Sequence, residues 1–332
     1  MRDVAALAGV SLKTVSRVIN REPGVSSQLV DRVLEAVRLL DYHHNMTASS
    51  LRRADQKTAS IGLLLEDVAN PFSSTLHRAI EEVARQRGTL AFAGSSDEDP
   101  VREGELLRAF VARRVDGLIV VPSSRTDGGF WSERERLGTP TVCVDRPAAF
   151  REVDSVTVDN LDGARRAVRH LVAHGHRRIA FLGDLGTIWT AEQRRLGYLE
   201  GLAAEGIPHD AGLVRQDLTS IEAAEHAALA LLAQREPPSA LFTGQNLVTI
   251  GAIHALRRRG LQRRVALVGF DDFLLADMLD PAVTVVAQDP TTLGRTAAEL
   301  LFARLDGDRD PPRQVVVATT LVPRGSGEIP AS

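Results

Sequence analysis

From residue 60 onward the chain alternates short apolar runs with helical stretches, and this alternation constrains the fold more than any other feature. The runs are SIGLLLE, TLAFAG, DGLIVVP, PTVCVD, RIAFLG, SALFTG and RVALVGFDD. Strands that are apolar on both faces are typical of parallel sheets with helices on each side. Because the runs fall into two sets, they predict two α/β lobes, with a ligand cleft at the carboxyl ends of the strands.

The length and composition of the chain fit several soluble domains. A chain of 332 residues exceeds the size at which a single core stops growing, so two or three domains are expected. No apolar run approaches the ~20 residues that span a bilayer, and the start MRDVAALAGVS lacks the regions of a signal peptide. We therefore expect a cytoplasmic protein with no membrane partner. The single cysteine, Cys143, lies in the run PTVCVD, which favours a buried structural thiol over a nucleophile.

Three short helices are predicted before residue 45, and the second has two contrasting faces. Gly9 can take the positive φ of a tight turn, and Ser11 is suited to cap the helix that follows. The inward face of that helix holds Val15, Val18 and Ile19, and the outward face holds Lys13, Ser16, Arg17 and Asn20. The first helix points Val4, Ala5 and Ala8 inward, and the expected buried stripe of the third is Val30, Val33, Leu34, Val37 and Leu40. Such a set forms a helix-turn-helix unit, whose second helix can enter a major groove.

The charge distribution fits a nucleic-acid-binding segment at the amino terminus. The whole chain carries −3, but residues 1–57 hold nine Lys or Arg against six Asp or Glu, so this segment carries +3 and the remainder −6. A basic head on an acidic body is the pattern expected when only the head binds nucleic acid.

The segments DVAALAGVSLKTVSRVIN and VSSQLVDRVLEAVRLLDY resemble the DNA-binding head of the lactose-repressor (LacI/GalR) family of bacterial transcription regulators. The later segments IGLLLEDVANPF, HGHRRIAFLG and LVGFDD fall in the family's order, so the resemblance covers essentially the whole chain. It implies an all-α helix-turn-helix head and a two-lobed α/β core like a periplasmic binding protein, with parallel sheets and three crossovers near residues 158, 288 and 318. The expected boundaries are 1–44 for the head, 45–58 for a hinge helix, 59–157 plus 289–317 for the N-lobe, 158–288 plus 318–328 for the C-lobe, and 329–332 for a tail.

The resemblance also implies contacts between the head and double-stranded operator DNA. Lys13 and Arg17 would read the guanine O6/N7 edge, and Leu12 would offer an apolar contact, for example to a thymine methyl group. The implied phosphate contacts are Ser11, Thr14, Ser16 and Asn20. For Ser11, capping of the helix is an alternative role that is compatible with a phosphate contact.

In the hinge segment, the resemblance implies that Leu51 wedges between base steps in the minor groove and kinks the duplex. A flexible linker with an incidental leucine is the alternative interpretation. His43 and His44 stand where the family usually has a proline before Asn45, so the entry into the hinge is expected to be less rigid than in the family.

The effector positions that the family implies are Phe72, Ser123, Asp145, Trp189, Arg194, Asn246 and Asp271. Arg194 would grip the ligand, with its neighbour Arg195 as a one-residue alternative, and Asp271 would accept hydrogen bonds at the end of its strand. Trp189 could stack on a ring or pack in the core. At Asn246 the family more often has aspartate, and an amide both donates and accepts whereas a carboxylate only accepts. The resemblance therefore does not identify a particular sugar.

The predicted function is a sequence-specific DNA-binding regulator, a repressor, controlled by a small polar effector, a sugar, in the cleft. No GxxxxGK[ST], HExxH or GxSxG motif occurs, and HGH at 174–176 is expected to be a turn, so we expect no catalytic residues, metal or cofactor. One alternative is a sugar-binding protein for transport, against which the head and the missing signal peptide argue. The other is an enzyme using the cleft, against which the lack of a nucleophile–base constellation argues.

A palindromic operator requires a two-fold partner, so the protein is expected to be a homodimer. The final residues RGSGEIPAS have neither the length nor the heptad pattern of a coiled coil that would join dimers into tetramers. The dimer is expected to form through core helices such as 73–87 and 246–259.

Overall fold

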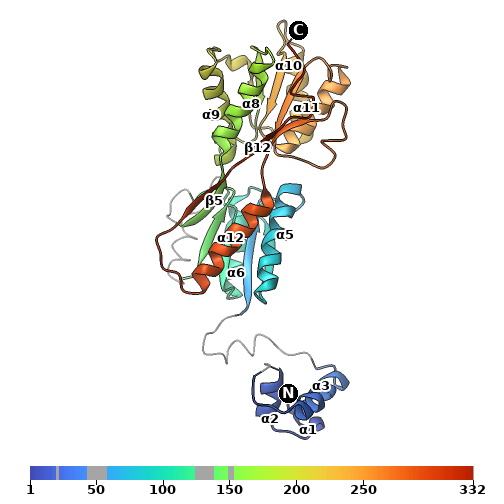
Figure 1. The fold of residues 1–332 in the computed structure, drawn as a ribbon, viewed down its shortest axis with the longest axis vertical. Coiled ribbons are helices and arrows are strands. Elements are labelled where there is room, and N and C mark those ends of the chain that lie inside the picture. The colour runs from blue at the N-terminus through green and yellow to red at the C-terminus, as the bar shows by residue number, and fades with distance from the viewer. Residues whose placement is uncertain (20–21, 43–57, 124–137, 149–152, 332) are drawn as a thin grey trace. The chain divides into compact units, whose positions relative to one another are not determined.

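The structure is a computed structural model that describes residues 1–19, 22–42, 58–123, 138–148 and 153–331 (Figure 1). It consists of two compact units, Met1–Thr58 and Ala59–Ser332, and each is described by itself. Asn20, Leu51 and nearly all of the predicted hinge lie outside the described residues.

The first unit contains the three predicted helices, α1 (Arg2–Ala8), α2 (Leu12–Ile19) and α3 (Ser27–Leu39). Gly9 ends α1 in the left-handed region, with φ 60° and ψ 40°, which a residue without a Cβ adopts at no steric cost. Each helix contributes one completely buried valine to a shared core, and these are Val4, Val15 and Val33. The helix-turn-helix head is therefore confirmed.

The expected stripe of α3 is wrong at two positions. Leu34 and Leu40 are 51% and 42% exposed, whereas Ala36 is 2% exposed. Val33, Ala36 and Val37 lie three or four residues apart and point toward α1 and α2, and Leu34 is turned about 100° away from Val33. Helices α1 and α2 cover only a narrow side of α3, so some of its apolar residues stay exposed.

The second unit begins with a six-stranded sheet in which every pair of neighbouring strands is parallel. The strand order is β11 (Gln314–Val317), β5 (Asp154–Val158), β4 (Thr141–Val144), β3 (Gly117–Val120), β1 (Ser60–Leu65) and β2 (Leu90–Ser95). In the centre, Leu63 lies opposite Ala93 on one side and Ile119 on the other. Helices α5 (Pro71–Gln86) and α12 (Pro290–Leu305) cover one face, and α6 (Pro100–Ala112) covers the other. Cys143 is buried in β4, as predicted.

The last strand of this sheet, β2, is less covered than the apolar run TLAFAG predicts. Leu90 and Phe92 are 60% and 45% exposed. β2 pairs only with β1 in the described sheet, so one side of the strand has no neighbour, and helices that pack over the central strands do not cover it fully.

The second sheet has the order β12 (Thr320–Val322), β10 (Thr284–Ala287), β9 (Ala266–Phe270), β8 (Ala240–Thr243), β6 (Ile179–Leu182) and β7 (Val214–Arg215). Its strands are parallel except β12, which runs antiparallel to β10. Helices α8 (Asn160–Ala173) and α9 (Trp189–Ala204) cover one face, and α10 (Ile221–Leu232) and α11 (Asn246–Arg258) cover the other. A short 3-10 helix, Ala211–Leu213, precedes β7.

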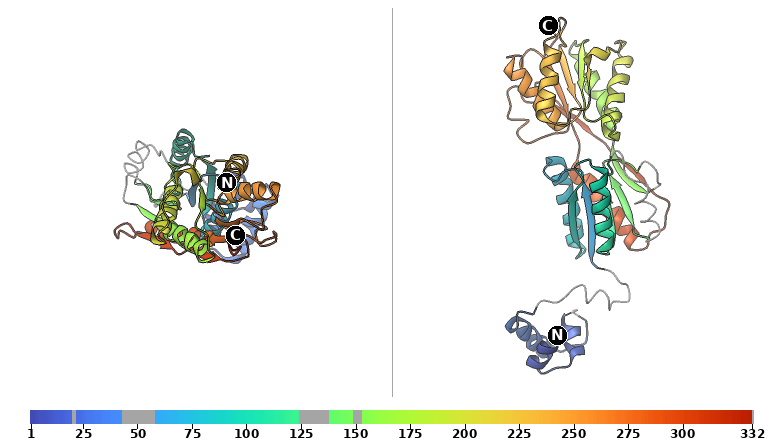
Figure 2. Two further views of the ribbon diagram at one scale, coloured as in Figure 1. Left: turned by 90° about the horizontal axis from the view of Figure 1, so that it is seen from above. Right: turned by 180° about the vertical axis from the view of Figure 1, so that it is seen from behind.

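The chain passes between the two sheets at three places, as Figures 1 and 2 show for the core. It leaves the first sheet between β5 and α8, returns between β10 and α12, and leaves again between β11 and β12. Each lobe is therefore built from separate chain segments, and the predicted two-lobed α/β architecture with parallel sheets is confirmed. Within the described parts of the chain, no helix combines the length and apolar character needed to cross a membrane.

Candidate functional site

The outward face of α2 begins with Ser11, which caps the helix. Its Oγ accepts a hydrogen bond from the Thr14 backbone N–H at 3.1 Å and lies 2.9 Å from the Thr14 hydroxyl. The next two side chains, Leu12 and Lys13, are exposed, and Thr14 and Ser16 are half-buried. The capped first turn thus presents Leu12 and Lys13 to the outside of the head.

Arg17 is not extended away from the head as the helical pattern predicts. Its Nη2 donates to the Pro23 carbonyl oxygen at 2.5 Å, and its Nε lies 3.7 Å from Glu22 Oε2. The guanidinium therefore lies over the segment that follows α2. A contact with a base would require Arg17 to exchange these partners for the base edge.

A cavity of about 370 Å³ lies in the core unit at the carboxyl ends of the strands of both sheets. This volume is within the range of small-molecule sites, about 300–1,000 Å³. The first lobe contributes side chains that follow β1, β2 and β4, and the second contributes side chains that follow β6, β8 and β9. Of the predicted effector residues, the lining includes Phe72, Asp145, Arg194 and Asp271.

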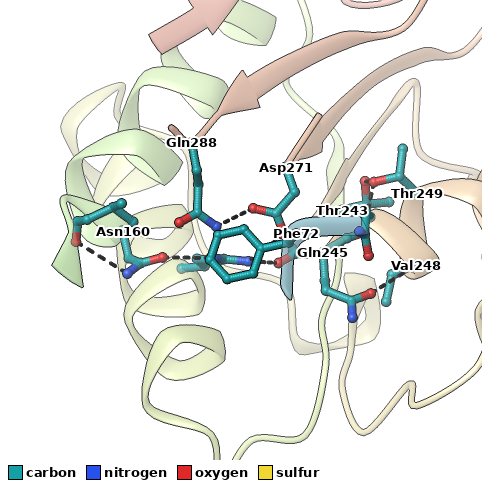
Figure 3. Close-up of polar contacts among 12 residues, drawn as sticks. Phe72, Asn160, Thr243, Gln245, Val248, Thr249, Asp271 and Gln288 are labelled. Carbon is teal, nitrogen blue, oxygen red and sulfur yellow. Dashed lines mark hydrogen bonds and ion pairs between the residues drawn. The ribbon is translucent and has the colours of Figure 1, made fainter. Parts of the chain in front are cut away.

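Arg194 is buried at the centre of a polar network in the second lobe, and Figure 3 shows its partners Asn160 and Asp271. Its Nε donates to Asn160 Oδ1 at 2.7 Å, and its Nη1 donates to the Gly244 carbonyl at 2.8 Å and lies 3.3 Å from Asp271 Oδ2. The guanidinium also lies 3.9 Å from the ring centroid of Phe270. Arg195 instead pairs with Glu192 at 2.7 Å, so Arg194 is the arginine in the cavity.

Gln288 completes this network from the crossing between β10 and α12. Its Nε2 donates to Asp271 Oδ1 at 2.5 Å (Figure 3). Asp271 is thus held by the Arg194 guanidinium on one oxygen and by the Gln288 amide on the other. This fixes the direction in which the carboxylate faces the cavity.

A second buried arginine, Arg146, follows β4 in the first lobe. Its Nη2 lies 2.7 Å from Glu98 Oε1, its Nε lies 3.4 Å from Asp145 Oδ2, and its Nη1 donates to the Pro122 carbonyl at 3.1 Å. The side chains of Arg146 and Asp145 are each 8% exposed. This pair gives the first lobe a charged cluster of its own in the cavity lining.

Burial raises the pKa of three carboxyls in the lining. The pKa of Glu66 rises to about 7, chiefly because of desolvation. Burial also raises the pKa values of Asp145 and Asp184, against the opposing attraction of Arg146. Desolvation disfavours the charged form of each group, so these three carboxyls are harder to ionise than exposed ones.

Three predicted effector residues do not line the cavity. Ser123 follows β3, where its backbone N–H donates to Glu103 Oε2 at 2.6 Å. Trp189 is the first residue of α9 and is half-buried, while its neighbours Ile188 and Thr190 line the cavity.

Asn246, the third of these residues, connects the lobes at the start of α11. Its Nδ2 donates to Asn70 Oδ1 at 3.1 Å, and its Oδ1 accepts from the Leu247 backbone N–H at 2.7 Å. The preceding residue, Gln245, lines the cavity and also caps α11. The amide of Asn246 therefore bridges the two lobes at this site.

Reasoning from the sequence missed several residues of the lining. They include Glu66, Glu98, Arg146, Asp184 and Gln288. A signal existed for three of them: Glu66, Arg146 and Asp184 follow the apolar runs GLLL, VCV and AFLG within two residues. Polar side chains at the carboxyl ends of parallel strands meet at one edge of the sheet.

A helix-turn-helix head joined to a two-lobed core with a polar cleft defines a ligand-responsive DNA-binding regulator. The family model "Bacterial regulatory proteins, lacI family" matches residues 1–45, and "Periplasmic binding protein-like domain" matches residues 168–327. Catabolite control protein A of Priestia megaterium is 33% identical, with 90% of each chain covered. The regulator GalR of Escherichia coli K12 is 32% identical over 100% of this chain and 96% of its own.

Solved structures agree with these relatives. A lac repressor dimer bound to operator and the anti-inducer ONPF is 27% identical, with a TM-score of 0.86 and 98% of each chain covered. A complex of the regulator CelR with cellobiose is 30% identical, with a TM-score of 0.74 and the same coverage. The chain belongs to the LacI family of bacterial regulatory proteins, and it is a DNA-binding transcriptional regulator.

Proposed function

We propose that this regulator is a repressor that binds a palindromic operator as a homodimer and responds to a small polar effector, a sugar, in the cleft. The observation that carries the proposal is the Arg194–Asp271–Gln288 network, which holds buried donors and acceptors at a cavity in the core of a chain that begins with a helix-turn-helix head. The solved relatives were bound to operator in one case and to cellobiose in another.

In this proposal the head reads DNA through Leu12, Lys13 and Arg17, and Leu51 of the hinge enters the minor groove. The head is positioned on the DNA by proposed phosphate contacts from Ser11, Thr14, Ser16 and Asn20. Exposure of Leu12 and Lys13 supports this assignment. Because Arg17 is paired with Pro23 and Glu22, it must leave these partners before it can contact a base.

For the effector, Phe72, Asp145, Arg194 and Asp271 are the proposed contacts, because all four line the cavity. The other three, Ser123, Trp189 and Asn246, are proposed to contact the effector after a movement of the lobes. An effector shifts DNA affinity only by binding one lobe arrangement more tightly than another. The Asn70–Asn246 hydrogen bond between lobes is a contact that such a movement would change.

The proposed domain boundaries remain 1–44 for the head, 45–58 for the hinge, and the two composite lobes up to residue 328. We also propose that the protein acts in the cytoplasm, without catalytic activity and without a cofactor. The dimer is proposed to use α5 and α11 together with exposed apolar side chains of the second lobe. Leu274 and Met278 are 81% and 76% exposed and would be covered in such a dimer.

The decisive experiment is selection of duplexes from a random DNA pool by the purified chain, followed by sequencing and by titration at fixed salt. A palindromic consensus bound far more tightly than bulk DNA is expected. Uniform, purely salt-dependent binding to all duplexes would contradict sequence-specific regulation. Light scattering of the same preparation is expected to give a mass of two chains.

A further inference from the structure

The lining of the cleft has more acidic than basic side chains. Its described residues include seven carboxylates and two guanidiniums, and no lysine or histidine is among them. The carboxylates are Glu66, Asp67, Asp97, Glu98, Asp145, Asp184 and Asp271, and the guanidiniums are Arg146 and Arg194. Such a lining disfavours a guest with a phosphate or carboxylate group, because clefts with one sign of charge concentrate ligands of the opposite sign.

Both guanidiniums are already occupied by protein partners. Arg194 is held by Asn160, Gly244 and Asp271. Arg146 faces Glu98 and Asp145 and donates to a backbone carbonyl. An anionic guest would compete with Asp271 for Arg194 and with Glu98 and Asp145 for Arg146.

The first lobe also has more acceptors than donors. Glu66 Oε1 accepts from the Ser73 hydroxyl at 2.8 Å, but Glu66 Oε2 is buried and has no hydrogen-bond partner among the described residues. Gln288 Oε1, across the cleft, is also buried and has no hydrogen-bond partner among the described residues. A buried acceptor without a partner costs free energy, so a guest that supplies donors is favoured at both walls.

A metal ion is the less suitable source of positive charge. Within the described residues, no group of three or more His, Cys, Asp or Glu side chains is arranged to hold a metal ion. The carboxylates are spread over both lobes around a cavity of about 370 Å³. An organic cation that carries several hydroxyl groups can fill this space and reach separate acceptors.

We infer that the effector of this cleft is a cationic polyol of the amino-sugar class. Its ammonium would lie beside the carboxylates that surround Arg146, chiefly Glu66, and its hydroxyls would meet Arg194 and Asp271. An ammonium has three donors and no acceptor, which matches the surplus of acceptors. The inference rests on the proposed function, because it takes the cleft as the effector site.

Glu66 is the carboxylate through which the inference can be tested with least disturbance. The titratable groups that face it are Arg146 and Asp145, and both remain in a Glu66→Gln variant. Glutamine keeps the shape of the side chain and an oxygen that can accept from Ser73, so the fold is preserved while the ionisable carboxyl is removed. Glu105→Gln is the matched control, since Glu105 is exposed on α6 and does not line the cleft.

The probes are matched pairs that differ in charge: glucosamine and glucose, galactosamine and galactose, and tris(hydroxymethyl)aminomethane and pentaerythritol. N-acetylglucosamine and glucose 6-phosphate complete the set. Binding to the full chain is measured by ligand-observed NMR and calorimetry at neutral pH. At least one amine is expected to bind about tenfold or more tightly than its neutral partner, because one ion pair in a partly buried site readily exceeds that ratio.

In Glu66→Gln the preference for the amine is expected to fall to about threefold or less, while Glu105→Gln keeps it. The inference is overturned if no amine binds, or if a neutral, acetylated or phosphorylated probe binds as tightly as the matching amine. It is also overturned if both variants keep the preference equally. Failure of the proposed function is a separate result, namely that the same preparation selects no operator from random duplexes, whatever the probes do.

Discussion

Arg194→Met is expected to destabilise the core strongly, because it removes the guanidinium from a buried network. The side chains of Arg194 and Asp271 are 5% and 9% exposed. Methionine retains apolar volume beside Phe270 but leaves Asn160 Oδ1, the Gly244 carbonyl and Asp271 Oδ2 without their donor. The perturbation therefore tests the polar contacts rather than the packing.

The expected loss is about 3–4 kcal/mol in the free energy of unfolding of the core. Hydrogen bonds to charged groups contribute roughly 1.5–3 kcal/mol each, and breaking one side of a buried ion pair typically costs about 3–5 kcal/mol. The variant no longer pays the cost of desolvating the guanidinium, so the net loss is smaller than these contributions added together. If Asp271 is neutralised as well, by Asp271→Asn, its uncompensated charge disappears, so the double variant should recover about 1–2 kcal/mol relative to additivity.

Urea unfolding followed by circular dichroism and by tryptophan fluorescence, to which Trp189 on the same helix contributes, measures these values. The two single variants and the double variant form a double-mutant cycle. A loss below about 1 kcal/mol for Arg194→Met, or strict additivity in the cycle, would refute the reasoning that this network stabilises the second lobe.

Further predictions concern the head, the helix packing, the pH dependence and the assembly. Arg17→Ala should weaken specific operator binding by roughly 1–3 kcal/mol and non-specific binding much less. Equal losses in titrations with operator and with bulk DNA would show that Arg17 contacts a phosphate and not a base. Gly197→Ala should destabilise by about 1–3 kcal/mol, because a Cβ would lie 2.2 Å from the Leu161 carbonyl oxygen. Gly104→Ala, whose Cβ would meet only the flexible end of the Arg108 side chain at 3.2 Å, should not lower the free energy of unfolding in the same urea experiment. Burial raises the pKa of Glu66 from 4.5 to about 7, so this group's contribution to stability falls as pH rises through that window. Glu66→Gln should therefore raise the free energy of unfolding by up to about 3 kcal/mol at pH 7 and leave it unchanged near pH 4, and equal effects at both pH values would contradict the assignment. A light-scattering mass of four chains would show that a surface other than those proposed joins dimers.

The sequence by itself determined the features that depend on local periodicity and on short motifs. The three helices of the head, the capping role of Ser11 and the left-handed turn at Gly9 were predictable because each depends on residues a few positions apart. The α/β alternation predicted two parallel-sheet lobes, since continuous apolar runs are typical of strands covered on both faces. Arg194 and Asp271 were placed by their positions in motifs, and the structure brings both into the cavity.

Only the tertiary structure decided which side chains share an environment. Glu66, Glu98 and Arg146 follow different strands and meet because those strands end at one edge of the sheet. The position of Arg17 over Pro23, the exposure of Leu34, and the contact between Asn246 and Asn70 likewise depend on long-range packing. A sequence pattern specifies the face of a helix or strand on which a residue lies. The partner that meets this face is set by the packing of distant segments, and so the charge balance of the cleft emerged only once both lobes were assembled.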